Sequence, residues 1–228
     1  MKELQLQPRL QLLADLVPQG ARLADIGTDH GYLPVWLLQK GRIASAIAAD
    51  IGAEPLEHAR RTAEEYEVQG IDFRLCDGLR DIAPEETDTV IIAGMGGDTI
   101  VSILSAAPWT KNGVKLLLQP MSKVEMLRVW LADNGYTFTD ERLVWDKNFL
   151  YPVFVVAGGV MPKLTAVQEY AGVMLDQDPL YGDYLDKQME RLQKAIDGLN
   201  RANDCISHGV ACEREAIRKA LEEKRRSL

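Results

Sequence analysis

The apolar residues between positions 20 and 120 fall into short runs that alternate with longer amphipathic stretches. Each run is rich in Val, Ile, Leu and Ala and is bounded by glycine or polar residues, as is typical of strands buried on both faces of a sheet. The stretches between the runs carry charged residues and alanine in helical proportion and end at glycines. We therefore predict crossover helices around a mostly parallel sheet, with strands at residues 22–26, 43–51, 71–75, 88–93 and 114–119.

Different patterns flank this region on either side. Residues 1–20 carry leucines near helical spacing and end in a proline and a glycine, which predicts an amphipathic helix. Residues 136–145 and 151–158 are rich in strand formers and flank the polar turn Asp146-Lys147-Asn148, which predicts a hairpin. An antiparallel pair of this kind would complete the sheet, so the predicted fold class is α/β with an antiparallel end.

The character of the chain changes at Gly158-Gly159. From Lys163 onward strand signals vanish, and apolar residues recur at alternating spacings of four and three, as in a coiled coil. We expect Gly209 to break this pattern into two helices that form an antiparallel hairpin. The predicted domains are therefore residues 1–159 and a C-terminal helical module of residues 160–228. The charged outer faces of this module fit either a solvated surface or a contact with RNA.

Composition and charge argue against two classes of protein, namely non-specific nucleic-acid binders and membrane or secreted proteins. The chain has 228 residues, 46% of them hydrophobic, and a formal net charge of -8. That charge argues against a protein that coats nucleic acid non-specifically, although it leaves room for a local basic patch. No apolar run reaches the ~20 residues of a membrane helix, and the start lacks the apolar core of a signal peptide. We expect a cytoplasmic protein with no membrane partner and, from its three scattered cysteines, no disulfide framework and no zinc site.

Candidate chemistry begins in the stretch RLADIGTDHGYLP, residues 22–34, which predicts a strand, a glycine loop and a helix. A dinucleotide-binding loop needs a second glycine two positions after Gly27, and this chain has Asp29 there. Asp25 and Asp29 would repel a diphosphate and suit a cationic cofactor such as S-adenosylmethionine. The alternative is that one of them only caps the following helix. Asp50, about 20 residues further on, stands where such folds hold a ribose hydroxyl.

Two further strand ends carry candidate residues. Asp77 and Gly78 follow the strand at 71–75, where an acid could bond the amino group of an adenine. Gly94-Met95-Gly96-Gly97 follows the strand at 88–93. So many glycines are costly to order, which favours a close approach of the backbone to a ligand over a simple tight turn.

Taken in order, the motifs ADIGTDHGYLP, AADI, CDGL, IAGMGG and LLLQP resemble the bacterial tRNA adenine-N1-methyltransferase family that modifies adenine 22 in the D arm, known as TrmK. The resemblance spans residues 1 to about 159, and the tail resembles the family in its general helical character. It implies a class I methyltransferase domain with a Rossmann-like sheet and a coiled-coil-like extension. The implied cofactor is S-adenosyl-L-methionine, and the implied partner is tRNA.

The resemblance also implies roles for single residues. Asp25 and Gly27 would line the methionine end of the cofactor, with Asp29 and His30 beside it. Asp50 would hold the ribose and Ile51 the adenine face, while Asp77 and Gly78 would address the adenine. The glycine turn of Gly94, Met95 and Gly96 replaces the Asn-Pro-Pro-Tyr type sequence of many amino-methyltransferases, so their base-binding details do not transfer.

Methylation of N1 needs no base to expose the nitrogen, but it creates positive charge on the adenine ring. We expect Asp29, assisted by the Gly94 carbonyl, to stabilise that charge, with His30 as the second candidate. Two rival functions stay open at this point. One is a methyltransferase of a small molecule or protein whose tail serves dimerisation, and the other is a nucleotide-dependent dehydrogenase or non-catalytic binding module. The sequence leaves the oligomeric state undecided.

Overall fold

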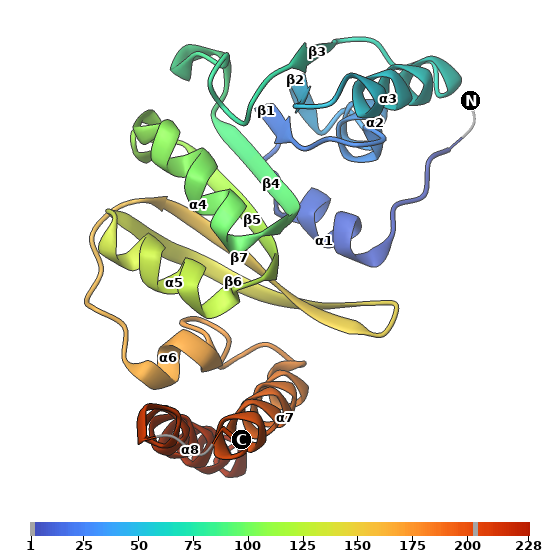
Figure 1. The fold of residues 1–228 in the computed structure, drawn as a ribbon. Coiled ribbons are helices and arrows are strands. Elements are labelled where there is room, and N and C mark those ends of the chain that lie inside the picture. Colours follow the sequence, from blue (N-terminus) through green and yellow to red (C-terminus); the bar gives the residue numbers. More distant parts are fainter. Residues whose placement is uncertain (1–2, 203–204) are drawn as a thin grey trace.

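The computed structural model describes residues 3–202 and 205–228, and a single mixed sheet organises them (Figure 1). Its strand order is β3-β2-β1-β4-β5-β7-β6. Strands β1 to β5 run parallel, and the β6–β7 hairpin adds the antiparallel end through pairing of β7 with β5. The predicted fold class is therefore confirmed. The strand bounds are β1 Ala21–Ile26, β2 Ile43–Asp50, β3 Ile71–Leu75, β4 Thr89–Gly96, β5 Lys115–Ser122, β6 Tyr136–Asp146 and β7 Phe149–Gly158.

Helices cover both faces of the sheet, and each face has its own buried core. On one face, α4 (Gly97–Ala106) and α5 (Val124–Asp133) pack on the central strands. On the other face lie α1 (Pro8–Leu16) and α2 (Tyr32–Gln39), with α3 (Ala53–Glu65) beside α2. Because the strands are buried from both sides, near-continuous apolar runs such as TVIIA in β4 are what the packing requires.

The first helix is shorter than the sequence pattern indicates. The prediction of a helix over residues 1–20 is wrong for residues 3–7, which precede α1 and are not helical. Pro8 explains the start, since proline has no amide hydrogen to donate and fits the first helical turn. Leu4 is buried against Val35 and Ala63 of the neighbouring helices, so its apolar character reflects tertiary packing.

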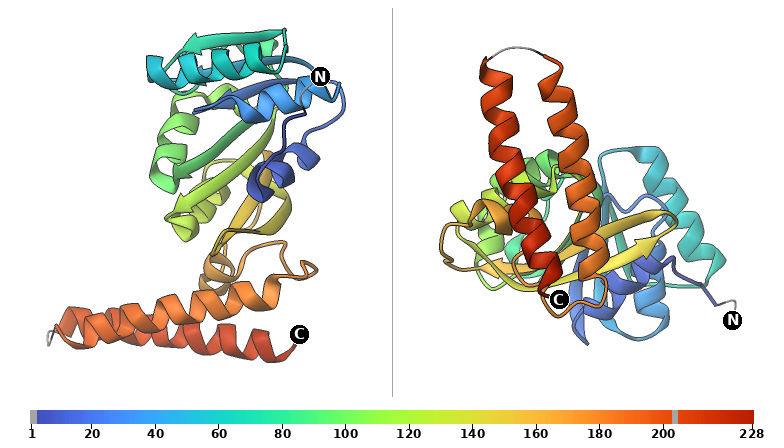
Figure 2. Two further views of the ribbon diagram at one scale, coloured as in Figure 1. Left: turned by 90° about the vertical axis from the view of Figure 1, so that its right-hand side faces the viewer. Right: turned by 90° about the horizontal axis from the view of Figure 1, so that it is seen from below.

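The C-terminal helical module consists of α6 (Ala166–Ala171), α7 (Tyr181–Asn200) and α8 (Cys205–Arg226). The long helices α7 and α8 lie antiparallel and project beyond the body of the molecule (Figure 2). The predicted break at Gly209 is wrong, because that glycine lies inside α8 and the turn falls after Asn200. A glycine inside a helix costs only about 1 kcal/mol, which the packing of α8 on α7 outweighs.

A fully buried arginine ties this module to the sheet. Arg128 of α5 donates to Glu141 of β6 through Nε at 2.9 Å and Nη2 at 2.7 Å, and Nη2 also lies 2.9 Å from the Tyr184 hydroxyl of α7. Its Nη1 donates to the carbonyl of Glu169 in α6 at 2.8 Å. One guanidinium therefore joins α5, β6, α6 and α7, and its exposed fraction is zero.

The edge strand β6 is also tied to the segment before α7. The Asp178 carboxylate accepts a hydrogen bond from the backbone N–H of Leu143 at 2.9 Å and another from the N–H of Leu180 at 2.9 Å. The side chain of Leu143 packs into a cluster with Leu175 and Leu185. The segment around Asp178 therefore occupies the edge of β6 at this point.

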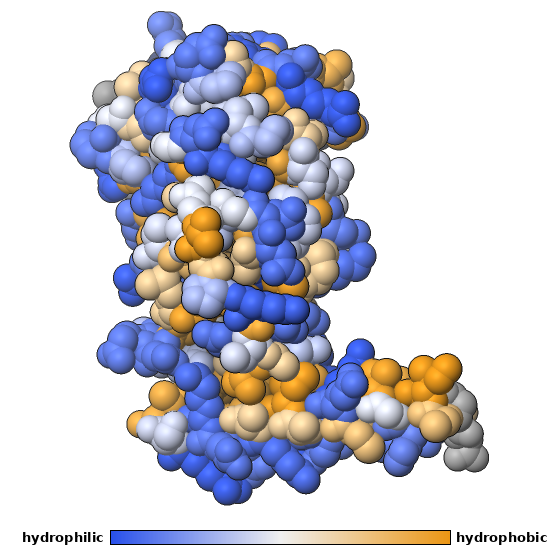
Figure 3. Space-filling view, turned by 90° about the vertical axis from the view of Figure 1, so that its left-hand side faces the viewer, coloured by the Kyte–Doolittle hydropathy of each residue, from blue (hydrophilic) through white to orange (hydrophobic). Residues whose placement is uncertain are grey.

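On the face shown in Figure 3, hydrophilic side chains line the lower edge of the module, and a band of apolar side chains runs along its middle to the far end. Ile206, at the start of α8, is 82% exposed. Several basic residues expected on the outer faces are paired with acids of the module, as in Arg225–Asp186 and Lys224–Asp176. None of the described helices is long and apolar enough to cross a membrane.

Candidate functional site

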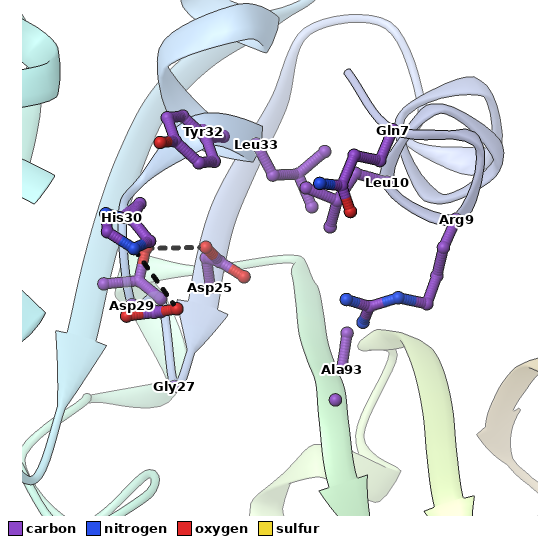
Figure 4. Close-up of a pocket in the computed structure, with 12 residues that line it drawn as sticks. Gln7, Arg9, Leu10, Asp25, Gly27, Asp29, His30, Tyr32, Leu33 and Ala93 are labelled. Carbon is purple, nitrogen blue, oxygen red and sulfur yellow. Dashed lines mark hydrogen bonds and ion pairs between the residues drawn. The ribbon is translucent and has the colours of Figure 1, made fainter. Parts of the chain in front are cut away.

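A cavity of about 310 Å³ opens at the carboxyl ends of β1 and β4. These strands flank the point where the chain order of the sheet reverses, which is where open α/β sheets bind ligands. Figure 4 shows Asp25, Asp29 and His30 on one side of the cavity and Arg9 on the other. Of the predicted site residues, the structure places five in its lining: Asp25, Gly27, Asp29, His30 and Gly94.

The glycine loop after β1 is shaped by the backbone. The amides of Gly27 and Thr28 both donate to the carbonyl of Ala49 in β2, at 2.8 and 3.2 Å. Gly27 has a φ of 74°, and a Cβ at this position would collide with Cε of Met95. The positive φ is what favours glycine here, since the Met95 methyl group is the flexible end of a side chain and could move aside.

Asp25 is buried at the base of the cavity, and the Thr28 hydroxyl donates to its carboxylate at 2.7 Å. Burial raises the pKa of Asp25 from 3.8 to about 6, the nearby Asp50 charge adds to the rise, and the Thr28 hydrogen bond opposes it. Among the described residues no Lys, Arg or His forms an ion pair with Asp25. A cationic ligand would therefore stabilise the ionised form of Asp25 strongly.

Asp29 and His30 stand at the rim of the cavity. Asp29 has a φ of 50° and a side chain that is 70% exposed, with its carboxylate 3.8 Å from Nε2 of His30. The His30 ring stacks between Tyr32 and His58, with centroid distances of 5.2 and 5.1 Å. The stack thus reaches from the loop to α3 and brings His58 to the site.

Asp29, His30 and His58 place potential ligand atoms within 4.8 Å of one another. Their geometry does not suit a metal ion as it stands. The lone pair of an imidazole lies in the plane of its ring, and the two rings are stacked with their planes only 9° apart. Their lone pairs therefore do not converge on one point, as the ligands of a tetrahedral site must.

Arg9 of α1 is a site residue that sequence reasoning missed. Its Nη1 donates to Oε1 of the fully buried Gln119 at 2.8 Å, and its Nε lies 3.5 Å from the Asp146 carboxylate. The same Gln119 oxygen accepts from the backbone N–H of Gly94 at 3.1 Å. Gln119, the polar residue of the motif LLLQP, therefore fixes both Arg9 and the glycine turn. No local signal marks Arg9, because α1 reaches the cavity only through tertiary packing.

The remaining predicted residues lie beside the cavity and outside its lining. Asp50 at the end of β2 accepts from the Gly52 amide at 2.8 Å, and the exposed Ile51 lies between them in the chain. Asp77 pairs with Arg80 at 3.0 Å. Gly78 has a φ of 64°, and a Cβ there would lie 2.9 Å from Ile103. The ends of β2 and β3 thus extend the same edge of the sheet away from the cavity.

The last two predicted residues end β4. Met95 packs against Gly27, as described above. A Cβ on Gly96 would lie 2.7 Å from the Asp98 carboxylate, which itself pairs with Lys123 at 2.9 Å. The prediction that residues 94–97 follow the strand is wrong, because β4 continues to Gly96 with an irregular register around Gly94, and α4 begins at Gly97. Of Gly94, Met95 and Gly96, Gly94 is the one that lines the cavity.

Residues 6–154 match the model of a protein family described as "Methyltransferase domain". The chain is 36% identical over 190 residues to the tRNA (adenine(22)-N(1))-methyltransferase of Bacillus subtilis (strain 168), an alignment that covers 82% of this chain and 78% of that relative.

Two solved structures are similar over nearly the whole chain. The B. subtilis M1A22 tRNA methyltransferase TrmK superposes with a TM-score of 0.86 at 28% identity, covering 96% of this chain and 99% of that chain. The Streptococcus pneumoniae protein Sp1610, crystallised in complex with S-adenosyl-L-methionine, superposes with a TM-score of 0.81 at 32% identity, covering 93% of this chain and 97% of that chain. The similarity therefore includes the helical module as well as the sheet.

Proposed function

The chain belongs to the family of tRNA (adenine(22)-N(1))-methyltransferases, and from this premise we propose that it transfers a methyl group from S-adenosyl-L-methionine to N1 of adenine 22 in tRNA. The observation that carries the proposal within the site is the buried carboxylate of Asp25, which lies in the cavity at the switch point of the sheet without a cationic partner among the described residues. Because tRNA is the substrate, the expected location is the cytoplasm.

The cavity suits the amino-acid part of this cofactor. Asp25 faces it from β1 and Arg9 faces it from α1, so an ammonium and a carboxylate can each meet an opposite charge (Figure 4). Gly27 and Gly94 offer backbone without side chains. When bound, the cofactor supplies a methyl group on a sulfonium sulfur, a cationic centre that two carboxylates in the lining favour.

We assign the rest of the cofactor to the strand ends beside the cavity. Asp50 would accept from ribose hydroxyls, since its Oδ1 is engaged by the Gly52 amide and its other oxygen accepts no hydrogen bond from the residues that the structure describes. Ile51 is exposed and can cover one face of the adenine. Asp77 and Gly78 close the same edge at the end of β3, where they would bond the amino group of the adenine.

For the methyl transfer, the protein must align N1 of the adenine with the methyl group and stabilise the positive charge that develops on the base. N1 of adenine has a free lone pair at neutral pH, so no residue has to remove a proton before the attack. Positive charge then develops on the base. The Asp29 carboxylate at the rim and the carbonyl of Gly94 would stabilise that charge. Their presence in the cavity lining, and the Gln119 side chain that accepts from the Gly94 amide, support this assignment. His30, whose Nε2 lies 3.8 Å from the Asp29 carboxylate, would accept a hydrogen bond from the exocyclic amine, which carries part of that charge.

Mass spectrometry of nucleosides from unmodified tRNA, incubated with the protein and S-adenosylmethionine, tests the function directly. We expect 1-methyladenosine among the nucleosides, and mass spectrometry of ribonuclease fragments of the same tRNA should locate it at position 22. If no methyl group enters tRNA although the cofactor binds, the proposal fails and a small-molecule or protein acceptor takes its place.

Replacing Asp29 with asparagine is expected to lower kcat by roughly 100-fold or more, because the substitution removes the charge that faces the developing cation. The fold should be unchanged, since asparagine accepts the left-handed backbone at this position. Single-turnover methylation of tRNA measures the effect, with Asp15→Asn, on the solvent face of α1, as the matched control. A kcat near that of the wild type would remove Asp29 from the mechanism.

The affinity for S-adenosylhomocysteine, which keeps the ammonium, is expected to depend on pH. The ammonium prefers the ionised form of Asp25, whose pKa in the free protein is about 6. Below that pH a proton must leave Asp25 before the ligand binds, so the affinity should fall by roughly tenfold for each pH unit. Calorimetry between pH 5 and 8 measures this slope, and an affinity that does not change over this range would contradict the role of Asp25.

A further inference from the structure

A second cavity, of about 460 Å³, lies where the β6–β7 hairpin, the end of β5 and helix α7 meet. We call it the hairpin groove and define it by six of its lining residues: Met121, Phe149, Tyr151, Lys187, Arg191 and Lys194. The buried side chains of Tyr184 and Gln188 also line it. None of the candidate residues named above for the cofactor or for catalysis lies in this groove.

The hairpin groove is joined to the active site through β5 and the hairpin. Pro120 and Met121, which line the groove, directly follow Gln119, whose side chain holds Arg9 and Gly94 in the first cavity. Asp146, at the end of β6, also contacts Arg9. A molecule whose reacting base enters the first cavity would therefore have its neighbouring groups close to the groove.

Flat apolar side chains are exposed on one side of the groove. Phe149 is 63% exposed at the start of β7, and its ring centroid lies 6.0 Å from that of Tyr151. Met121, near the end of β5, is 46% exposed. Aromatic rings that are left open to solvent give a surface on which unpaired bases stack, and each such contact contributes about 1–3 kcal/mol.

The other side of the groove carries three basic residues and one acid, Glu190. Lys187, Arg191 and Lys194 recur at helical spacing on one face of α7. Lys187 and Arg191 form partly exposed ion pairs with Glu190 and Glu125, which contribute little and can exchange for a phosphate. Lys194 has no acidic partner in the part of the chain that the structure describes. On a chain with a net charge of -8, this strip is suited to a polyanion.

We propose that the hairpin groove binds an unpaired nucleotide of the tRNA that neighbours the target adenine, with the base on Phe149 and the phosphate on the α7 strip. This inference rests on the proposed function, because N1 of the target becomes accessible only when the base is unpaired, which leaves nucleotides beside it unstacked. The pairing of open aromatic rings with cations, next to a site for a nucleobase, favours RNA over a protein partner.

The test uses Phe149→Ala and Lys194→Ala in the full chain. We expect each to raise KM for tRNA about tenfold, while kcat at saturating tRNA and the affinity for S-adenosylhomocysteine stay within about twofold of the wild type. Phe149→Trp should restore KM, because it restores a stacking surface. Lys194→Ala should also reduce the salt dependence of tRNA binding by about one phosphate contact. Both residues are exposed, and Ile206→Ala and Lys219→Ala, on α8, are the matched controls.

The possible outcomes separate this inference from the function it rests on. If the wild type methylates tRNA and neither Phe149→Ala nor Lys194→Ala changes KM, the groove does not bind the substrate and the inference is overturned. If Phe149→Ala changes only the oligomeric state in light scattering, the groove is an interface between copies and the inference is likewise overturned. If the wild type methylates no tRNA at all, the proposed function itself is rejected.

Discussion

Replacing Asp25 with asparagine is expected to weaken the binding of S-adenosylhomocysteine by roughly 100-fold. Removing one partner of a buried, hydrogen-bonded charge pair costs about 2–5 kcal/mol, and 3 kcal/mol corresponds to about a 100-fold change in Kd. Asparagine keeps an oxygen that can accept from the Thr28 hydroxyl, so the local geometry should persist. Calorimetric titration at pH 7.5 measures the change, and Asp15→Asn serves as the control.

The same substitution is expected to stabilise the free protein at neutral pH. The pKa of Asp25 is about 6 in the folded state, above its ordinary value of 3.8, so the folded state binds more protons between these values. The stability of the wild type must then fall as the pH rises from about 4 to about 6, by about 3 kcal/mol in total. Asparagine does not ionise and avoids this loss.

Urea unfolding without ligand, at pH 4 and at pH 7.5, measures this effect. The gain from Asp25→Asn should be small at pH 4 and should approach about 3 kcal/mol at pH 7.5. Opposite changes in affinity and stability would identify Asp25 as a residue kept for binding at the expense of stability. A variant that loses stability at pH 7.5 and keeps its affinity would contradict the assignment of the ammonium to Asp25.

Replacing Arg128 with methionine is expected to lower the free energy of unfolding by about 3–5 kcal/mol. The substitution leaves the buried carboxylate of Glu141 without its cation, and it removes the donor from the Glu169 carbonyl and the Tyr184 hydroxyl. Burial of the apolar methionine side chain offsets only part of this. Urea unfolding gives the magnitude, and Arg142→Met, which breaks a partly exposed pair with Asp140, should cost less than about 1 kcal/mol.

Adding Glu141→Gln to Arg128→Met should restore part of the lost stability, because a neutral amide no longer needs a cation. The recovery should be incomplete, since Oε2 of Glu141 also accepts from the amides of Val173 and Met174, at 2.7 and 3.1 Å. A cost below about 1 kcal/mol for Arg128→Met alone would mean that the helical module docks mainly through its apolar cluster.

Local sequence signals account for most of the sheet and for one side of the cavity. The buried runs that predict β1 to β5, the glycine loop with Asp25 and Asp29, and the turn at Asp146 all depend on residues close together in the chain. Such features can be predicted because strand burial and turn geometry are decided by neighbours. The confirmed fold class rests on these signals.

The features that could not be predicted depend on contacts between distant residues. Arg9 and Gln119 are 110 positions apart, and Arg128 meets Glu169 and Tyr184 across 41 and 56 positions. In the sequence these arginines look like ordinary surface charges. The predicted helix break at Gly209 is wrong for the same reason, because the packing of α8 against α7 stabilises the helix through this glycine. The helical module, predicted as a separate unit from residue 160, is likewise joined to the sheet by a buried ion pair that no local pattern reveals.

The hydrogen bond between Asp178 and the Leu143 amide of β6 also affects how the protein associates with other copies at high concentration. An outer strand with free backbone groups is a template on which another chain can add a strand, the first step toward aggregation. Here the Leu143 amide is already engaged by Asp178, and the strand at the opposite end of the sheet, β3, is only five residues long and carries Asp72 and Arg74. Each end of the sheet therefore carries a feature that hinders edge-to-edge association.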